Sequence, residues 1–125
     1  MKIHFNQPTI SGNELNYISD AIKKGHNSGD GFYTKACHSW FKKNYKTKCA
    51  LLTHSATAAL EMAAILCDFE IGDEIIIPSY TFVSTANAFC LRGYVPRFVD
   101  VSMEDLNTNV SSVEASINEK TKAII

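Results

Sequence analysis

Hydroxyl-bearing and small residues gather in one short turn of this sequence. Ser55, Ala56 and Thr57 stand between an apolar run and a helical pattern. Unpaired backbone N–H groups and the positive end of the dipole attract anions to the start of a helix. The two hydroxyl groups add donors, and the alanine lets an anion approach the backbone. The turn could therefore bind a phosphate group without a lysine or arginine; the alternative is that it is an ordinary helix N-cap.

An aromatic residue, Phe82, marks a second turn of the same kind. With Tyr80 it follows the branched apolar segment 74–78 and precedes another helical pattern. The carboxyl ends of parallel strands share one edge of a sheet, so Phe82 is expected at the same edge as the phosphate-binding turn. An aromatic face beside an anion site suits a flat, phosphorylated ring. The alternative is that Phe82 packs into the core, as most phenylalanines do.

A third candidate is the loop at residues 25–31, which contains three glycines together with Asn27, Ser28 and Asp30. This composition disfavours regular structure and predicts a mobile or ligand-facing loop that includes Gly29 and Asp30.

Alternating elements must position these residues. Strands are predicted at 49–53, 74–78, 95–101 and 122–125, with helices at 57–67 and 82–91 and a further helix capped by Ser111 and Glu114. This rhythm predicts an α/β fold with a parallel sheet covered by helices. Amphipathic helices are expected before it at 11–25 and 34–45, the first opening with Ser11 and Glu14 in capping-box spacing. The final strand stops at Ile125 in an apolar run, so the sequence is expected to be truncated.

Composition limits the classes of function. Twelve basic against thirteen acidic residues give a net charge of −1, so no general positive field attracts nucleic acid or a membrane surface. The N-terminus lacks the apolar region of a signal peptide, and no apolar run approaches the length of a membrane span. The spacing of the four cysteines matches neither a metal clip nor a disulfide scaffold. A soluble, cytoplasmic protein without a metal site is expected.

Taken together, these motifs resemble those of the DegT/DnrJ/EryC/StrS family of sugar aminotransferases, which use pyridoxal 5′-phosphate (PLP). The similar segments follow one another in order and spacing over essentially the whole chain: FNQPTISGNELNYISDAI, SGDGFYTKACHSWF, LLTHSATAALEMAAIL, GDEIIIPSYTFVSTANAFCLRG and FVDV. The resemblance implies the N-terminal part of the large domain of a fold-type I aminotransferase, a mostly parallel sheet with helices on both faces. Residues 1–48 would supply N-terminal helices and an active-site loop, and residues 49–125 the first βαβαβ part of the PLP-binding domain.

The resemblance also implies roles for the candidate residues. The turn of Ser55, Ala56 and Thr57 would bind the PLP phosphate through backbone amides and a hydroxyl group, and Phe82 would stack on the pyridine ring. The loop around Gly29 and Asp30 would approach a nucleotide-sugar substrate.

No catalytic residue is expected in the chain itself. The Schiff-base lysine of the family, and the acidic partner of the pyridinium nitrogen, lie beyond the position matching Ile125, so these residues alone are expected to be inactive. The implied reaction transfers an amino group, from glutamate, to a nucleotide-linked 4-keto-6-deoxy sugar of the dTDP type for surface polysaccharide or antigen synthesis. The family also implies a homodimer. Two alternatives stay open: a nucleotide-sugar dehydratase of the same fold, and a non-catalytic α/β module that binds a phosphorylated ligand.

Overall fold

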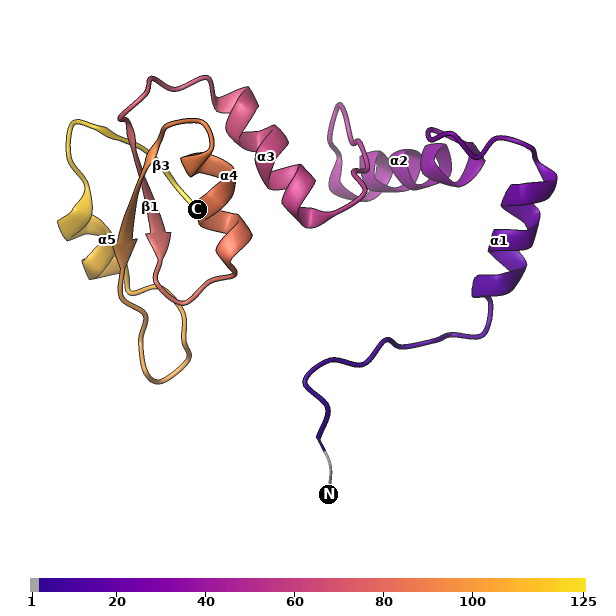
Figure 1. Ribbon diagram of the computed structural model, residues 1–125, viewed down its shortest axis with the longest axis horizontal. Helices are drawn as coiled ribbons and strands as arrows, with labels where there is room; N and C mark the ends of the chain where they lie inside the picture. The colour runs from indigo at the N-terminus through magenta and orange to yellow at the C-terminus, as the bar shows by residue number, and fades with distance from the viewer. Residues whose placement is uncertain (1–2) are drawn as a thin grey trace. The chain divides into compact units, whose positions relative to one another are not determined.

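The computed structural model describes residues 3–125, and the chain divides into two compact units, Met1–Leu52 and Thr53–Ile125 (Figure 1). Each unit is described by itself. The division expected from the sequence, at residue 48, concerns the domains of an enzyme and stays a prediction.

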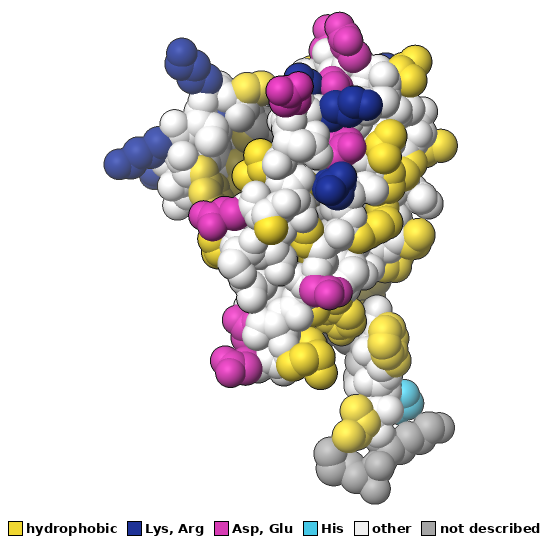
Figure 2. Space-filling model, turned by 90° about the vertical axis from the view of Figure 1, so that its left-hand side faces the viewer, with side chains coloured by type: hydrophobic (Ala, Val, Ile, Leu, Met, Phe, Trp, Pro, Cys, Tyr) yellow, Lys and Arg dark blue, Asp and Glu magenta, His cyan; other side chains and the backbone are white. Residues whose placement is uncertain are grey.

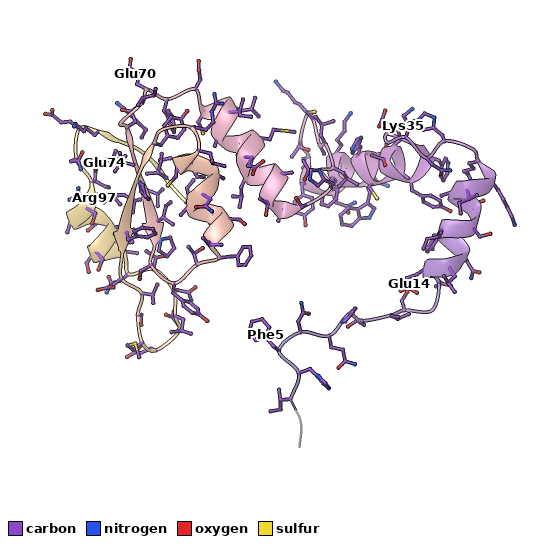
Figure 3. All side chains as sticks on the ribbon, in the orientation of Figure 1. Phe5, Glu14, Lys35, Glu70, Glu74 and Arg97 are labelled. Atoms are coloured by element: carbon purple, nitrogen blue, oxygen red, sulfur yellow. The ribbon has the colours of Figure 1, made fainter. Side chains whose placement is uncertain are left out.

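The first unit consists of two helices joined by the glycine-rich loop. Helix α1 spans Glu14–Lys23 and helix α2 spans Phe32–Tyr45, which confirms the two predicted helices with shifted ends. The predicted pair Ser11 and Glu14 is present, but Glu14 is the first residue of the helix and the N-cap position is occupied by Asn13. The Glu14 carboxylate accepts hydrogen bonds from the Ser11 N–H at 2.6 Å and the Gly12 N–H at 2.9 Å. These bonds lower the pKa of Glu14, labelled in Figure 3, to about 2.

Neither α1 nor α2 has a buried residue. Aromatic side chains of α2 instead pack on one another at its surface, with Phe41 and Tyr45 stacked at a ring-centroid distance of 5.7 Å and Trp40 edge-on to Phe41 at 5.2 Å. Among residues 3–52, the first unit therefore has no buried apolar core, and its loop depends on polar contacts.

The second unit is a three-stranded parallel sheet with helices on both faces. The strands are β1 (Glu74–Pro78), β2 (Val95–Val99) and β3 (Thr121–Ile124), in the order β2-β1-β3. Helices α3 (Ala56–Cys67) and α4 (Val83–Cys90) lie on one side of the strands, and α5 (Val110–Ser116) lies on the other (Figure 1). This arrangement confirms the predicted α/β fold class.

The strand predicted at 49–53 is wrong, because these residues form no β structure. A strand requires a neighbour for its N–H and C=O groups, and none of β1, β2 and β3 pairs with this segment. The Leu52 N–H donates instead to the His38 side chain. The second unit accordingly begins with the helix α3 and not with a strand.

Two smaller differences lie near the end of the chain. The predicted strand at 95–101 stops at Val99, and Val101 forms only an isolated antiparallel bridge with Thr108. Helix α5 is capped by Asn109 and not by Ser111, because the Asn109 side chain accepts a hydrogen bond from the Ser111 N–H at 2.9 Å.

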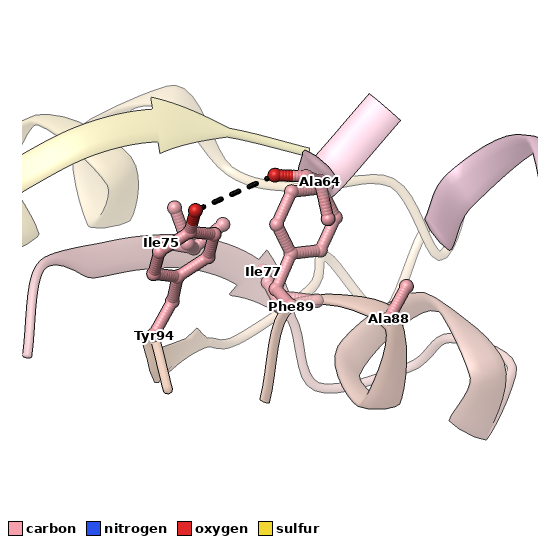
Figure 4. Packing of buried hydrophobic residues seen from close by; sticks show 6 residues of the cluster. All are labelled: Ala64, Ile75, Ile77, Ala88, Phe89 and Tyr94. Carbon is pink, nitrogen blue, oxygen red and sulfur yellow. Dashed lines mark hydrogen bonds between the residues drawn. The ribbon is translucent and has the colours of Figure 1, made fainter. Parts of the chain in front are cut away.

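The apolar core of the second unit lies between the sheet and the α3–α4 layer (Figure 4). Its buried residues come from one face of β1, from both helices and from the segment before β2: Ala64, Ile75, Ile77, Ala88, Phe89 and Tyr94. The Tyr94 hydroxyl donates to the Ala64 carbonyl at 3.4 Å and accepts from the Phe69 N–H at 3.2 Å, so this buried polar group is satisfied at both ends. Many other apolar side chains stay exposed between charged groups (Figure 2).

Candidate functional site

The turn before α3 offers backbone donors to a ligand. Ser55 is the N-cap of the helix, with extended backbone, and its Oγ accepts a hydrogen bond from the Ala58 N–H at 3.1 Å. The first N–H that bonds within the helix is that of Ala59, which donates to the Ser55 carbonyl at 3.2 Å. Within residues 3–125, the N–H groups of Ala56 and Thr57 have no acceptor. The N-cap interpretation of the turn is therefore confirmed, and two N–H groups remain without an acceptor, so phosphate binding is compatible with the cap and stays a prediction.

The side chains of the turn leave these donors accessible. Ser55 and Ala56 are exposed and Thr57 is half-buried. The backbone is further fixed by Thr53, whose hydroxyl donates to the Ser55 carbonyl at 2.7 Å. No lysine or arginine occurs in residues 53–57. Attraction of an anion would therefore depend on the N–H groups, the hydroxyls and the dipole of α3.

Phe82 stands at the equivalent place before α4. It is the N-cap residue of that helix, with extended backbone, and its side chain is 73% exposed. The alternative that Phe82 packs into the core is therefore wrong for the residues described. The backbone before it is anchored, because the Ser79 N–H donates to the Val99 carbonyl at 2.8 Å.

The two turns lie at the same end of the sheet. Both α3 and α4 are joined to β1 by short connections, both run in roughly the opposite direction to this central strand, and both begin toward the end at which β1 stops, with α4 the nearer of the two (Figure 1). Ligands of open α/β sheets bind at this carboxyl edge. The unpaired donors of the turn before α3 and the exposed aromatic ring of Phe82 therefore lie toward the same end of β1, and the binding of a phosphate and a flat ring there stays a prediction.

The loop of the first unit is shaped by two glycines. Gly29 has a φ of +100°, in the region that favours glycine. Gly31 is restricted in another way, because a Cβ atom there would lie 2.9 Å from the His26 carbonyl oxygen. The His26 ring closes the loop with its Nε2 atom 2.8 Å from the Gly29 carbonyl oxygen.

A cavity of about 250 Å³ adjoins this loop. Residues from the end of α1, the loop and the start of α2 line it, among them Lys24, His26, Asn27, Phe32 and Tyr33. The Lys24 ammonium lies 4.7 Å from the centroid of the Phe32 ring, within the range of a cation–π interaction.

One acidic residue holds both Lys24 and Tyr33 at this cavity. Asp20 forms an ion pair with Lys24 and accepts a hydrogen bond from the Tyr33 hydroxyl at 2.7 Å. The bonds from Lys24 and from Tyr33 lower the pKa of Asp20, and the same carboxylate raises the pKa of Tyr33. Sequence analysis missed these three residues; the available signal was a lysine and an aromatic pair flanking the glycine-rich loop.

The candidate residues thus form two groups, each in its own unit. Ser55, Ala56, Thr57 and Phe82 belong to the second unit, and Gly29 and Asp30 belong to the first. Across residues 3–125, no group of three or more His, Cys, Asp or Glu side chains is arranged to hold a metal ion. In the same range, no helix combines the length and the apolar character needed to cross a membrane.

Comparison with known protein families gives one assignment over nearly the whole chain. A model of the DegT/DnrJ/EryC1/StrS aminotransferase family matches residues 8–125. Over 119 residues the chain is 34% identical to a GDP-perosamine synthase of Vibrio cholerae and 31% identical to a GDP-perosamine synthase of Escherichia coli O157:H7. These alignments cover 95% of the chain but only 32% and 33% of the two relatives. The chain therefore spans about a third of the length of the curated relatives that it matches.

Solved structures of a putative sugar aminotransferase and a sugar dehydratase are also similar to this chain. The PLP form of the putative sugar aminotransferase Spr1654 from Streptococcus pneumoniae has a TM-score of 0.87 and 28% identity, over 99% of this chain and 31% of that one. An E. coli GDP-4-keto-6-deoxy-D-mannose-3-dehydratase with bound hydrated PLP has a TM-score of 0.84 and 25% identity, over 94% of this chain and 32% of that one.

Proposed function

Because the chain belongs to the DegT/DnrJ/EryC1/StrS aminotransferase family, we propose that it forms the N-terminal part of a PLP-dependent enzyme that transfers an amino group to a nucleotide-linked sugar. The observation that carries this proposal is the carboxyl edge of the sheet. There the open N–H groups of Ala56 and Thr57 and the exposed ring of Phe82 lie at the same end of one packed unit.

This edge fits the two ends of the cofactor. The N–H groups of Ala56 and Thr57, with the Thr57 hydroxyl, would donate hydrogen bonds to the PLP phosphate, and a helix N-terminus favours its negative charge. The exposed face of Phe82 would stack on the pyridine ring and fix its plane. When bound, PLP supplies an electron sink for moving an amino group between an amino acid and a keto sugar. The residues of this chain orient the cofactor for that chemistry.

The sugar nucleotide would approach the loop of the first unit. Gly29 has open space where a Cβ atom would stand, so a ligand could come close to the main chain there. The Lys24 ammonium, which is paired with Asp20, lines the adjoining cavity and could also donate a hydrogen bond to the diphosphate of a nucleotide sugar.

The nucleotide of the substrate is the part of the proposal on which the resemblance and the relatives differ. The family resemblance implies a dTDP-linked 4-keto-6-deoxy sugar, whereas two relatives, at 34% and 31% identity, are named GDP-perosamine synthases. We therefore take a GDP-linked 4-keto-6-deoxy sugar as the first candidate and the dTDP-linked sugar as the second. Glutamate as the amino donor, a role in surface polysaccharide synthesis and a homodimer remain predictions from the family resemblance.

The test uses the complete protein that contains these residues. We expect it to purify with, or to take up, PLP, visible as absorbance of the bound cofactor, and to convert GDP-4-keto-6-deoxymannose with glutamate to an amino sugar detected by mass spectrometry. The same assay with dTDP-4-keto-6-deoxyglucose shows whether the enzyme uses a GDP-linked or a dTDP-linked sugar. Failure to bind PLP would refute the proposal.

A second candidate, a dehydratase, is favoured by the likeness to a solved GDP-4-keto-6-deoxy-D-mannose-3-dehydratase at 25% identity. The product decides between the two reactions. A transaminase exchanges the keto oxygen for an amino group, whereas a dehydratase removes a hydroxyl group as water and leaves a product without the new nitrogen. Binding of PLP with neither product would favour the third alternative, a non-catalytic binding module.

A further inference from the structure

The cavity beside the glycine-rich loop has a positively charged side chain in its wall. Its volume is about 250 Å³, and the residues that line it all belong to the first unit. Among the described residues that line it, Lys24 alone carries a permanent positive charge and none is acidic. Asn27 and Thr34 add an amide and a hydroxyl group, which can donate hydrogen bonds. The wall of this cavity therefore favours an anionic group.

The volume of the cavity limits which part of a sugar nucleotide can enter. Pockets that enclose a drug-sized molecule measure about 300–1,000 Å³, so this cavity is too small for a whole sugar nucleotide. The diphosphate is the part of such a molecule whose charge is complementary to the Lys24 ammonium. The base and the sugar ring are uncharged and would gain little from it.

Lys24 is held in place by two contacts. Its ammonium pairs with Oδ2 of Asp20, one turn earlier on the same helix, and lies 4.7 Å from the centroid of the Phe32 ring. A lysine ammonium has three N–H donors, so the pair with Asp20 leaves donors for an anion. The Lys24 side chain is 38% exposed and can be reached by a ligand. Holding this flexible side chain in advance lowers the entropic cost of ordering it on binding.

Tyr33 fixes the carboxylate that holds Lys24. Its hydroxyl, on α2, donates to the same Oδ2 atom of Asp20 at 2.7 Å, so one oxygen accepts from both side chains. This bond also ties together the two helices whose ends line the cavity. Without it, the Asp20 carboxylate could turn, and the ammonium paired with it would lose its fixed position. Tyr33 should therefore act on a bound anion through Lys24.

We propose that this cavity receives the diphosphate of the sugar nucleotide, with Lys24 as the binding residue and Asp20 and Tyr33 as positioning residues that hold its ammonium. The inference rests on the proposed function, which gives the class of substrate. It adds a chain of contacts from Tyr33 through Asp20 to Lys24. A tyrosine that only stabilised the first unit would affect diphosphate binding equally with and without the lysine.

Inorganic pyrophosphate tests the diphosphate contact alone, in the complete protein loaded with PLP. By isothermal titration calorimetry, we expect Lys24→Gln to raise the dissociation constant of pyrophosphate about threefold to thirtyfold, because a partly exposed charge-assisted contact is lost. Tyr33→Phe should raise it about twofold to fivefold. The KM for the sugar nucleotide should rise in the same order, whereas kcat and the dissociation constant of PLP should not change.

Combined variants test the chain of contacts. In the Lys24→Gln background, Tyr33→Phe should change the dissociation constant of pyrophosphate by less than about 1.5-fold, because the side chain that it positions is gone. In the Asp20→Ala background, Tyr33→Phe should likewise have no further effect, because its hydrogen bond is already lost.

Two matched variants serve as controls and should leave pyrophosphate binding unchanged. Lys23→Gln makes the same change of charge at an exposed residue of α1 that does not line the cavity. Tyr17→Phe removes the hydroxyl of a ring that packs edge-on to Tyr33 at 5.4 Å but, within residues 3–125, makes no hydrogen bond to Asp20.

Three results would overturn the inference: no binding of pyrophosphate by the unmodified protein, an effect of Lys24→Gln no larger than that of Lys23→Gln, or single effects that multiply in the double variant. The proposed function fails separately. If pyrophosphate binding depends on Lys24 but no amino sugar forms from either sugar nucleotide, the proposed reaction is refuted and the anion-binding role of Lys24 stands.

Discussion

Thr57→Val is the most direct test of the phosphate-binding turn. Thr57 is half-buried in the first turn of α3, and within residues 3–125 its hydroxyl has no hydrogen-bond partner. Valine has nearly the same shape, so the substitution removes a donor and leaves the packing. Ser55 would be a poorer choice, because its Oγ also caps the Ala58 N–H and its loss would weaken the helix.

The size of the effect follows from the negative charge of the proposed acceptor, the PLP phosphate. A hydrogen bond to a charged group contributes about 1.5–3 kcal/mol, which corresponds to a factor of about 10 to 150 in a dissociation constant. We expect Thr57→Val to raise the dissociation constant of PLP by this factor, measured by absorbance titration of the complete apoprotein. The N–H groups of Ala56 and Thr57 remain, so binding should be weakened and not abolished.

Two controls make this prediction specific to the phosphate. Pyridoxal lacks the phosphate group, so it should bind equally to the unmodified protein and to Thr57→Val. Thr47→Val makes the same chemical change at an exposed residue outside both candidate sites and should leave PLP binding unchanged. The assignment of the Thr57 hydroxyl as a donor to the PLP phosphate would be refuted by either of two results. One is that Thr57→Val weakens the binding of pyridoxal and of PLP equally, and the other is that its PLP dissociation constant stays within about twofold of the original.

Three further predictions test other parts of the chain. Phe82→Leu should raise the dissociation constant of PLP about twofold to tenfold, because it removes ring stacking, whereas Phe98→Leu, at an exposed residue of β2, should not. Tyr94→Phe should lower the free energy of unfolding of the complete protein, measured in urea, by about 1–3 kcal/mol, because the Ala64 carbonyl and the Phe69 N–H lose their hydrogen bonds to the hydroxyl. An unchanged unfolding midpoint would contradict this prediction. The Glu14 carboxylate should titrate near pH 2 when followed by NMR. Its lowered pKa adds folding stability that is present above about pH 4.5 and is lost as the pH falls through about 2. Titration near pH 4.5 would show that its hydrogen bonds do not form in solution.

The success of the fold prediction depended on whether a segment finds its partners within the chain. The segment 74–78 was predicted correctly because a run of branched residues suits a central strand, and Ile75, Ile76 and Ile77 are fully buried between two neighbours. The segment 49–53 has a similar apolar pattern but no strand beside it, so the pattern alone predicted a strand that is absent. The sequence indicates the tendency of a segment to form a strand, and pairing with a neighbouring strand decides whether that strand forms.

The same distinction applies to the candidate site. The turn at Ser55 could be predicted because its donors depend on the local start of a helix. The Asp20, Lys24 and Tyr33 cluster could not, because its hydrogen bond joins residues 13 positions apart on two helices. The hydrogen bond from the Leu52 N–H to His38 was missed for the same reason, since Leu52 lies 14 residues further along the chain.

The two groups of candidate residues differ in what holds them, and this difference bears on how such an enzyme could change its specificity. Helix α3, which begins at the candidate phosphate-binding turn, is part of an apolar core, because its Ala64 belongs to the same buried cluster as Ile75 and Ile77. The loop at residues 25–31 has no core beneath it and depends on a few polar contacts, such as those of His38 and Asp30. In the proposed enzyme, the cofactor would bind to the packed unit, and the sugar nucleotide would contact the loop. We therefore expect substitutions in the loop to alter sugar binding without disturbing the core that would orient the cofactor.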